Sequence, residues 1–212
     1  MNLYLKLKTR FGHWTPRYIY NRVHLIVVEF KHPDWPWLTK DAILILNQLL
    51  NQDDIGLEFG SGRSTVWFAQ KINHLTSIEH DNFWFSKIKE KLENDNLISK
   101  VEYNLVKPTQ LDYLKILEKI ENESMDFVLI DGLFRDRACL NSIPKLKKGG
   151  ILIIDNINWF IPNKSYSPNS LKNRYESEIW SNIFEKVVKG WRRIYTTNGV
   201  TEIYLSFFYP YI

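Results

Sequence analysis

The chain has 212 residues, of which 44% are hydrophobic and 25% are charged, and its formal net charge is +4. This composition is typical of a globular protein and excludes a disordered or fibrous chain. The single cysteine, Cys139, excludes an internal disulfide, and no Cys/His cluster with zinc-ligand spacing occurs in the sequence. The apolar run at residues 25–28 is far shorter than the roughly 18 residues of a membrane-spanning helix. We therefore expect a soluble, cytoplasmic protein.

The positive charge is concentrated near the N-terminus. Residues 1–40 contain seven Lys or Arg against two acidic residues, which gives +5, whereas the remainder is close to neutral. Aromatic side chains alternate with these charges, a mixture that suits an anionic membrane surface, RNA or a protein partner. We interpret residues 1–35 as a basic aromatic arm whose aromatic side chains pack on its own domain. Peripheral membrane contact through this arm is the alternative, and nucleic-acid binding is not expected.

From residue 36 onward, helical and strand-like segments alternate, and this alternation predicts an α/β fold with a mostly parallel sheet. Strands are predicted at residues 55–59, 75–79, 101–106, 127–130 and 151–154, with a hairpin formed by residues 191–196 and 201–208. Helices are predicted after Thr39 and at residues 65–72, 82–93, 111–121, 137–146 and 175–189. Residues 157–174 lack periodicity and read as a long loop of the kind that forms lids. The expected sheet has seven strands, helices on both faces and a C-terminal antiparallel hairpin.

A glycine-rich turn follows the first predicted strand, where a helix begins. Glu58 precedes Gly60, Ser61 and Gly62 in this turn, and the glycines let a ligand approach the backbone closely. Glu79 ends the second predicted strand, at the spacing where a carboxylate accepts hydrogen bonds from the ribose hydroxyls of an adenosine ligand. A carboxylate at Glu58 repels a pyrophosphate but attracts the ammonium and sulfonium groups of S-adenosylmethionine, directly or through water. The alternative is that Glu58 only caps the turn.

These residues resemble the class I S-adenosylmethionine-dependent methyltransferases, whose first motif reads acid-x-Gly-x-Gly. Three further segments are similar to that family: residues 77–81 resemble its ribose-binding acid, residues 126–132 its fourth strand and residues 146–156 its fifth. The resemblance covers residues 36–208 and implies a Rossmann-like fold with S-adenosylmethionine as cofactor. We accordingly expect residues 36–212 to form the cofactor-binding methyltransferase domain.

The resemblance also implies roles for individual residues. Gly60, Ser61 and Gly62 would border the methionine end of the cofactor, Glu79 would hold its ribose, and His80 would flank its adenine.

Oxygen-bearing side chains follow the fourth and fifth predicted strands. Because ligands in open α/β sheets bind beyond the carboxyl ends of the strands, Asp131, Asp155 and Asn156 should open into one crevice. Asp131 is the first candidate for a catalytic base and for a further cofactor contact, and Asp155 is the second candidate base. The same three side chains are weak candidates for Mg²⁺ ligands, in an order similar to that of catechol O-methyltransferase. In the alternative without metal, Asp131 contacts the cofactor and Asp155 caps a turn.

Two arginines follow Asp131 and bear on the choice of acceptor. Arg135 and Arg137 could bind a carboxylate or phosphate of the substrate, or they could belong to the exposed face of the next helix. In the predicted loop, Trp159, Phe160, Lys164 and Tyr166 could form a lid over the acceptor or could staple the loop to the surface.

The predicted function is O-methylation of a small-molecule or glycan-type acceptor. Two alternatives stay open at this stage. An NAD-dependent oxidoreductase would use the same glycine-rich turn and Glu79, and a non-catalytic binding protein would act through the N-terminal arm. The identity of the acceptor and the oligomeric state do not follow from the sequence.

Overall fold

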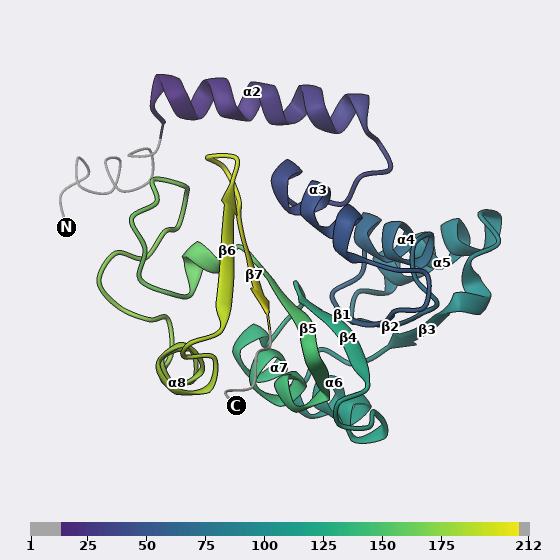
Figure 1. Cartoon of the computed structure of the whole chain (residues 1–212). Coiled ribbons are helices and arrows are strands. Elements are labelled where there is room, and N and C mark those ends of the chain that lie inside the picture. Colours follow the sequence, from purple (N-terminus) through teal and green to yellow (C-terminus); the bar gives the residue numbers. More distant parts are fainter. Residues whose placement is uncertain (1–13, 208–212) are drawn as a thin grey trace.

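The computed structural model describes residues 14–207. Five parallel strands form most of the sheet: β1 (Ile55–Phe59), β2 (His74–Glu79), β3 (Val101–Leu105), β4 (Met125–Ile130) and β5 (Leu146–Asp155). A hairpin of β6 (Arg192–Thr197) and β7 (Glu202–Phe207) completes it, and β7 pairs with β5 in the antiparallel direction. The strand order is β3-β2-β1-β4-β5-β7-β6 (Figure 1). The predicted seven-stranded sheet with its C-terminal hairpin is therefore confirmed.

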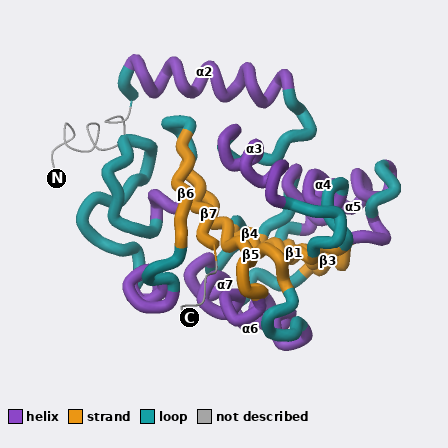
Figure 2. The backbone as a smooth tube through the Cα atoms, in the orientation of Figure 1, coloured by secondary structure: helices purple, strands orange, loops and turns teal. Residues whose placement is uncertain are grey.

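Helices alternate with the parallel strands, as the sequence predicts. The α-helices are α2 (Pro16–Lys31), α3 (Lys40–Leu49), α4 (Arg63–Ala69), α5 (Asn82–Asn94), α6 (Gln110–Lys115), α7 (Arg135–Ser142) and α8 (Glu178–Asn182). Short 3₁₀ segments are η1 (Ile98–Lys100), η2 (Ile116–Lys119), η3 (Ile143–Lys145) and η4 (Ile157–Trp159), and the π-helix η5 (Ile183–Val187) continues α8. Figure 2 shows helices on both sides of the strands.

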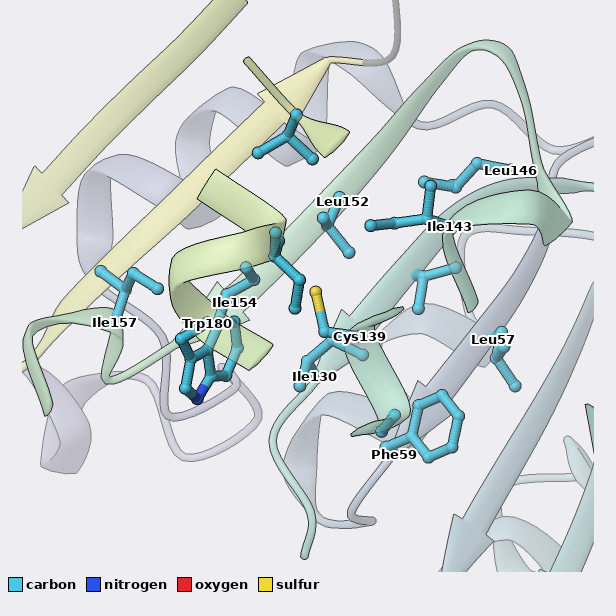
Figure 3. Packing of buried hydrophobic residues seen from close by; sticks show 14 of the residues in the cluster. Leu57, Phe59, Ile130, Cys139, Ile143, Leu146, Leu152, Ile154, Ile157 and Trp180 are labelled. Atoms are coloured by element: carbon cyan, nitrogen blue, oxygen red, sulfur yellow. The ribbon is translucent and has the colours of Figure 1, made fainter. Parts of the chain in front are cut away.

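The central strands of the sheet are buried on both faces. Helices α3, α4 and α5 pack on the face that carries Phe127 and Ile153. Helices α6, α7 and α8 cover the opposite face, where Trp180 packs with Leu152 and Ile154 (Figure 3). Successive residues of a strand point to opposite faces, so each central strand supplies apolar side chains to both layers. Polar side chains that serve a function are therefore expected at the strand ends.

The fifth strand begins earlier than predicted. β5 starts at Leu146, so the two glycines at positions 149 and 150 lie within the strand and do not end a helix. The register between β4 and β5 shifts between Met125 and Phe127, which accommodates the extra residues. Helix α7 ends at Ser142 because Pro144 lacks the N–H group that would continue an α-helix.

The described part of the N-terminal segment is a helix, which the sequence analysis did not predict. Thr15 caps α2 by accepting a hydrogen bond from the backbone N–H of Tyr18 at 3.2 Å, and Pro16 occupies the first turn. The expected packing of aromatic side chains on the domain is wrong for Trp14 and Tyr20, which are 58% and 70% exposed. Phe30 is 87% exposed as well, whereas Tyr18 is half-buried and Trp35 packs against the core. The aromatic residues at positions 4 and 11 lie outside the described residues. Between residues 14 and 207, no helix combines the length and apolar character needed to cross a membrane.

Candidate active site

The glycine-rich turn between β1 and α4 lies directly against the end of β4. Gly60 has a φ of +88°, and a Cβ atom there would lie 2.8 Å from both the carbonyl carbon of Asp131 and the amide nitrogen of Gly132. A Cβ atom on Gly132 would in turn lie 2.9 Å from the amide nitrogen of Gly60. The backbone N–H of Asp131 donates to the carbonyl of Phe59 at 2.9 Å. The backbones at the ends of β1 and β4 are therefore in direct contact. This contact requires glycine at positions 60 and 132 because any side chain would occupy the space of the other backbone.

Gly62 borders open space. Its φ of 175° is ordinary extended backbone, and a Cβ atom built there would meet no atom within 4 Å. Its amide N–H donates to the hydroxyl of Thr65 at 3.0 Å, which fixes the start of α4. The hydrogen bond fixes the turn, and the space next to Gly62 is open. The turn therefore fits a cofactor bound next to residues 60–62, as the sequence predicts.

Glu58 is completely buried beneath this turn. Its carboxylate accepts hydrogen bonds from the hydroxyls of Ser64 at 2.5 Å, Thr65 at 2.6 Å and Ser77 at 2.7 Å. Burial raises the pKa of Glu58 to about 7, although the three hydroxyl hydrogen bonds act in the opposite direction. In this arrangement Glu58 holds the turn to β2 and α4. Its contact with a cofactor stays a prediction.

We expect the folding stability to fall as the pH rises from 4.5 to about 7 because of Glu58. In the folded protein this carboxyl keeps its proton up to about pH 7, whereas its ordinary pKa is 4.5. The folded state therefore binds more protons across that window, and it loses about 3 kcal/mol of unfolding free energy as the pH increases through it. Urea unfolding over this pH range measures the effect. Glu58→Gln should have a correspondingly flatter profile, and a profile parallel to that of the wild type would contradict the assignment.

Glu79 lies at the end of β2 and faces the same turn. Its side chain is almost fully buried and accepts four hydrogen bonds. Ser61 donates from its backbone N–H at 2.9 Å and from its hydroxyl at 2.6 Å, and the N–H groups of His80 and Asp81 donate at 2.7 and 2.8 Å. The hydroxyl of Tyr103 lies 2.6 Å from that of Ser61. The predicted contact of Glu79 with a ribose remains a prediction, in which a ribose hydroxyl would take the place of the Ser61 hydroxyl.

The ring of His80 is held between two neighbours. Its Nδ1 lies 3.0 Å from the hydroxyl of Tyr113 and 3.1 Å from the carboxylate of Glu79. The sequence analysis missed both Tyr103 and Tyr113. Neither follows a strand directly, and each reaches the site from an element that is distant in the chain, so no local pattern signals them.

The structure brings Asp131, Asp155 and Asn156 to one guanidinium group. Arg135 Nη2 donates to Asp131 Oδ1 at 2.7 Å, and Arg135 Nη1 donates to the carbonyl of Asp155 at 2.8 Å and lies 3.5 Å from Asn156 Oδ1. Arg135 Nε donates to the carbonyl of Gly132 at 3.1 Å. Neither alternative that the sequence left open for Arg135 holds: its donors are used within the chain and not for an anionic acceptor, and its side chain is only 15% exposed and so does not lie on the exposed helix face. Arg135 connects the ends of β4 and β5.

The two carboxyl groups beside Arg135 differ in exposure. The side chain of Asp131 is 35% exposed and that of Asp155 is 9% exposed. Burial raises the pKa of both groups, and the charge of Asp131 raises the pKa of Asp155 further, while Arg135 lowers both. Asp155 Oδ1 is buried and has no hydrogen-bond partner among residues 14–207. We assign the retained proton to Asp155 and the negative charge to Asp131, which is more exposed and lies closer to Arg135.

The oxygen atoms considered for Mg²⁺ surround the positive charge of Arg135. The ion pair with Asp131 has a length of 2.7 Å, and the distance from Arg135 to Asp155 Oδ2 is 3.9 Å. Within the described residues no group of three or more His, Cys, Asp or Glu side chains is arranged to hold a metal ion. The residues present therefore do not fit the Mg²⁺ site considered from the sequence.

A cavity of about 670 Å³ lies between α2, the loop that follows β5, and the β6–β7 hairpin. Its lining combines aromatic and polar side chains: Arg17, Tyr18, Asn21, Lys164, Tyr166, Tyr195, Glu202 and Tyr204. Glu202 is 1% exposed, and its Oε1 accepts hydrogen bonds from the hydroxyls of Ser165 and Ser167. Its Oε2 is buried without a partner in the described part of the chain. Glu202 precedes Ile203, which pairs with Asp155, so the cavity adjoins the carboxyl end of β5.

The long loop between β5 and α8 divides into two parts. Lys164 and Tyr166 line the cavity, as expected of a lid. The Trp159 ring N–H donates to the carbonyl of Pro168 at 3.1 Å, which joins two parts of the loop itself. Phe160 attaches the loop to α8, because its ring stacks on Trp180 with the ring centroids 5.1 Å apart. Glu202 was not predicted as a site residue. It lies in a strand of the hairpin, whereas the predicted site residues were sought at the ends of the parallel strands.

Residues 57–157 match the family of methyltransferase domains. This segment contains the turn after β1, the end of β2 and the ends of β4 and β5. A comparison with curated proteins gave no match.

Several solved structures share the fold over most of this chain. A protein from Staphylococcus aureus, provisionally assigned as a caffeoyl-CoA O-methyltransferase, is 18% identical over 95% of this chain and 97% of its own, with a TM-score of 0.59. A methyltransferase from Geobacter sulfurreducens is 14% identical over 90% of this chain and 89% of its own, with a TM-score of 0.57. A provisionally assigned methyltransferase from Streptococcus mutans, solved in complex with S-adenosylhomocysteine, is 16% identical over 80% of this chain and 98% of its own, with a TM-score of 0.55.

Proposed function

We propose that this chain is a class I S-adenosylmethionine-dependent methyltransferase and that it methylates an oxygen atom of a small-molecule or glycan-type acceptor; the family match at residues 57–157 and the similarity in fold to solved methyltransferases support this proposal. The observation that carries the proposal is the cluster of Asp131, Arg135 and Asp155 at the end of β4, which the glycine-rich turn contacts through Gly60. It supplies a carboxylate at the carboxyl ends of the central strands, where ligands bind in such sheets. The NAD-dependent alternative has no comparable support from the family match.

The proposed cofactor-binding site lies along the glycine-rich turn between β1 and α4. Gly60, Ser61 and Gly62 would border its methionine part, with Glu79 at its ribose and His80 near its adenine. The free room beside Gly62 and the two oxygens of Glu79 that face Ser61 and His80 support this placement. When bound, the cofactor supplies an electrophilic methyl group on a sulfonium.

Asp131 is the proposed general base. Asp131 would accept the hydroxyl proton of the acceptor as the acceptor oxygen takes the methyl group and the sulfur of the cofactor departs with the electron pair of the carbon–sulfur bond. Arg135 fixes this carboxylate at 2.7 Å, and burial raises its pKa, which makes it a stronger base than an exposed aspartate. Asp155, which holds its proton, would orient the acceptor oxygen. Alignment of donor and acceptor supplies much of the remaining catalysis.

The cavity lined by Glu202 is the proposed acceptor pocket. Its buried Oε2 lacks a hydrogen donor, which a hydroxyl group of the acceptor would provide. Tyr18, Tyr195 and Tyr204 offer ring surfaces on which a sugar or aromatic ring packs. The similarity in fold to a protein provisionally assigned as an O-methyltransferase agrees with oxygen as the target.

Calorimetric titration with S-adenosylmethionine, S-adenosylhomocysteine and NAD tests the cofactor. We expect the first two ligands to bind and NAD not to bind. Gly62→Val, which fills the open space, should weaken binding at least about tenfold, equivalent to about 1.4 kcal/mol. Circular dichroism and urea unfolding of this variant should match the wild type. Binding of NAD alone by the folded protein would overturn the assignment.

A screen of sugars and phenols with radiolabelled S-adenosylmethionine tests the acceptor class. Asp131→Asn should lower kcat about 100-fold for the methylated acceptor, because a general base contributes at least this much, and should leave cofactor affinity unchanged. Glu202→Gln should raise KM and leave kcat unchanged. A product methylated only on nitrogen would contradict the proposal, and lost cofactor binding in Asp131→Asn would assign that residue to the cofactor place instead.

A further inference from the structure

Helix α2 carries an apolar surface that faces away from the protein. Its exposed apolar side chains are 44–87% accessible: Ile19, Tyr20, Val23, Ile26, Val27 and Phe30. At 3.6 residues per turn these six positions fall within one arc of about 120° around the helix axis. No residue of α2 is buried, and the helix runs along one edge of the molecule (Figures 1 and 2). The arc is therefore a continuous stripe along the helix and not a set of scattered positions.

The opposite side of α2 is held by the protein. Tyr18 and Asn21 line the cavity beside the hairpin, and Leu25 and Val28 line a second cavity toward α3. The contact with the hairpin is close, since a Cβ atom on Gly199 would lie 2.0 Å from the side-chain nitrogen of Asn21. These residues lie on the side of α2 that faces the hairpin and α3, so the apolar arc on the opposite side is turned outward.

Basic residues border the arc on both sides. In the helical projection Lys31 lies about 20° beyond one edge of the arc, and Arg17 lies about 60° beyond it, toward the cavity. Arg22 lies about 40° beyond the other edge, next to Glu29, which is the only acidic residue of the helix. None of these three cations forms an ion pair with another residue between positions 14 and 207. The sequence adds three basic residues at positions 6, 8 and 10, just before the helix.

We propose that α2 binds an anionic phospholipid surface, lying in the plane of the interface with its apolar arc among the acyl chains. An apolar face bordered by Lys and Arg is the pattern of helices that lie on membranes, where cations meet lipid phosphates and apolar side chains enter below them. The apolar arc could also be covered by α2 of a second copy of the chain. This pairing is disfavoured because it would bring basic side chains of both copies close to one another. This inference does not rest on the proposed function.

Sedimentation with lipid vesicles tests the proposal on the full chain. The protein should sediment with vesicles that contain phosphatidylglycerol and much less with vesicles of phosphatidylcholine alone, and added salt should weaken binding because it screens the cations. The variant with Val23→Asp and Ile26→Asp should lose at least about tenfold in partitioning, since it places two charges within the arc. Equal binding of this variant and the wild type would overturn the proposal.

Two controls separate the competing explanations. Leu111→Asp, at a side chain that is 76% exposed on α6, makes the same chemical change away from α2 and should leave vesicle binding unchanged. The double α2 variant should keep the wild-type unfolding profile and cofactor affinity, so a failure of the proposed function would be visible separately. The oligomeric state is measured by size exclusion with light scattering. A wild-type dimer that becomes a monomer in the Val23→Asp, Ile26→Asp variant would overturn the lipid assignment.

Discussion

Gly60→Ala is expected to reduce the free energy of unfolding by about 2–5 kcal/mol. A non-glycine residue in the left-handed region costs about 1–2 kcal/mol, and forcing a methyl group into occupied space costs about 1–3 kcal/mol more. At Gly60 both costs apply, because φ is +88° and the new Cβ atom would lie 2.8 Å from backbone atoms of Asp131 and Gly132. Backbone atoms cannot rotate away as a flexible side chain does, so β1 and β4 must separate at their ends. Urea unfolding at neutral pH measures this loss.

The matched control is Gly62→Ala, two residues away in the same turn. Its extended φ of 175° suits alanine, and the new Cβ atom meets nothing within 4 Å. We expect its unfolding free energy to lie within about 0.5 kcal/mol of the wild type, as for a substitution that disturbs no contact. If Gly60→Ala and Gly62→Ala destabilised the protein equally, the close contact between Gly60 and the end of β4 would be contradicted.

Arg135→Met is expected to destabilise the protein by about 3–5 kcal/mol at neutral pH. The change leaves the partly exposed carboxylate of Asp131 and the buried carboxyl of Asp155 beside each other without their common cation. Loss of one partner of a fully buried ion pair has this magnitude, so the exposure of Asp131 favours the lower end of the range. The substitution also removes hydrogen bonds to the carbonyls of Gly132 and Asp155. Methionine fills much of the same volume, so the effect reports charge and hydrogen bonding more than packing.

The dependence of this loss on pH distinguishes the electrostatic cause. Burial already raises the pKa of Asp131 and Asp155, and removing Arg135 raises both further because Arg135 lowers them in the wild type. The folded variant then binds more protons than the unfolded chain above the ordinary pKa of aspartate, about 3.9, so its stability falls as the pH rises from there. The deficit relative to wild type should shrink toward acidic pH.

A second substitution provides the control for Arg135→Met. Adding Asp131→Asn removes the carboxylate that carries the negative charge and should restore part of the lost stability at neutral pH. A deficit that is equal at acidic and neutral pH, with no recovery in the double variant, would attribute the effect to packing.

The central strands were predictable because they combine short apolar runs with turn residues at their ends. β1 agrees with its predicted range, and β4 and β5 contain theirs. Helix α2 was missed because its apolar residues form a stripe among many charges, and the charges suggested an arm. The start of β5 was missed because a helix was predicted over residues 137–146, and because a strand with a register shift has no simple period.

In the candidate site, the residues that follow strand ends were predictable and their partners were not. The topology brings Asp131 and Asp155 together, and this follows from neighbouring parallel strands. Arg135 binds these two residues and not a substrate because of the path of the chain between β4 and α7, where Phe134 adopts a positive φ of 50°. No local sequence pattern predicts this path. The enclosure of Glu58 by three hydroxyls, and the position of Glu202, likewise arise from contacts between distant segments.

The order of the strands has a consequence for synthesis of the chain. β7 lies between β5 and β6, although it is made after both. The edge of β5 therefore stays unpaired while residues 156–201 are added, and it becomes covered only when β7 inserts. An open edge of apolar residues is a template for pairing between chains, and distant pairings form slowly. The nascent protein is thus most prone to aggregation after β5 is complete and before β7 emerges from the ribosome, which is the interval in which a chaperone would protect it best.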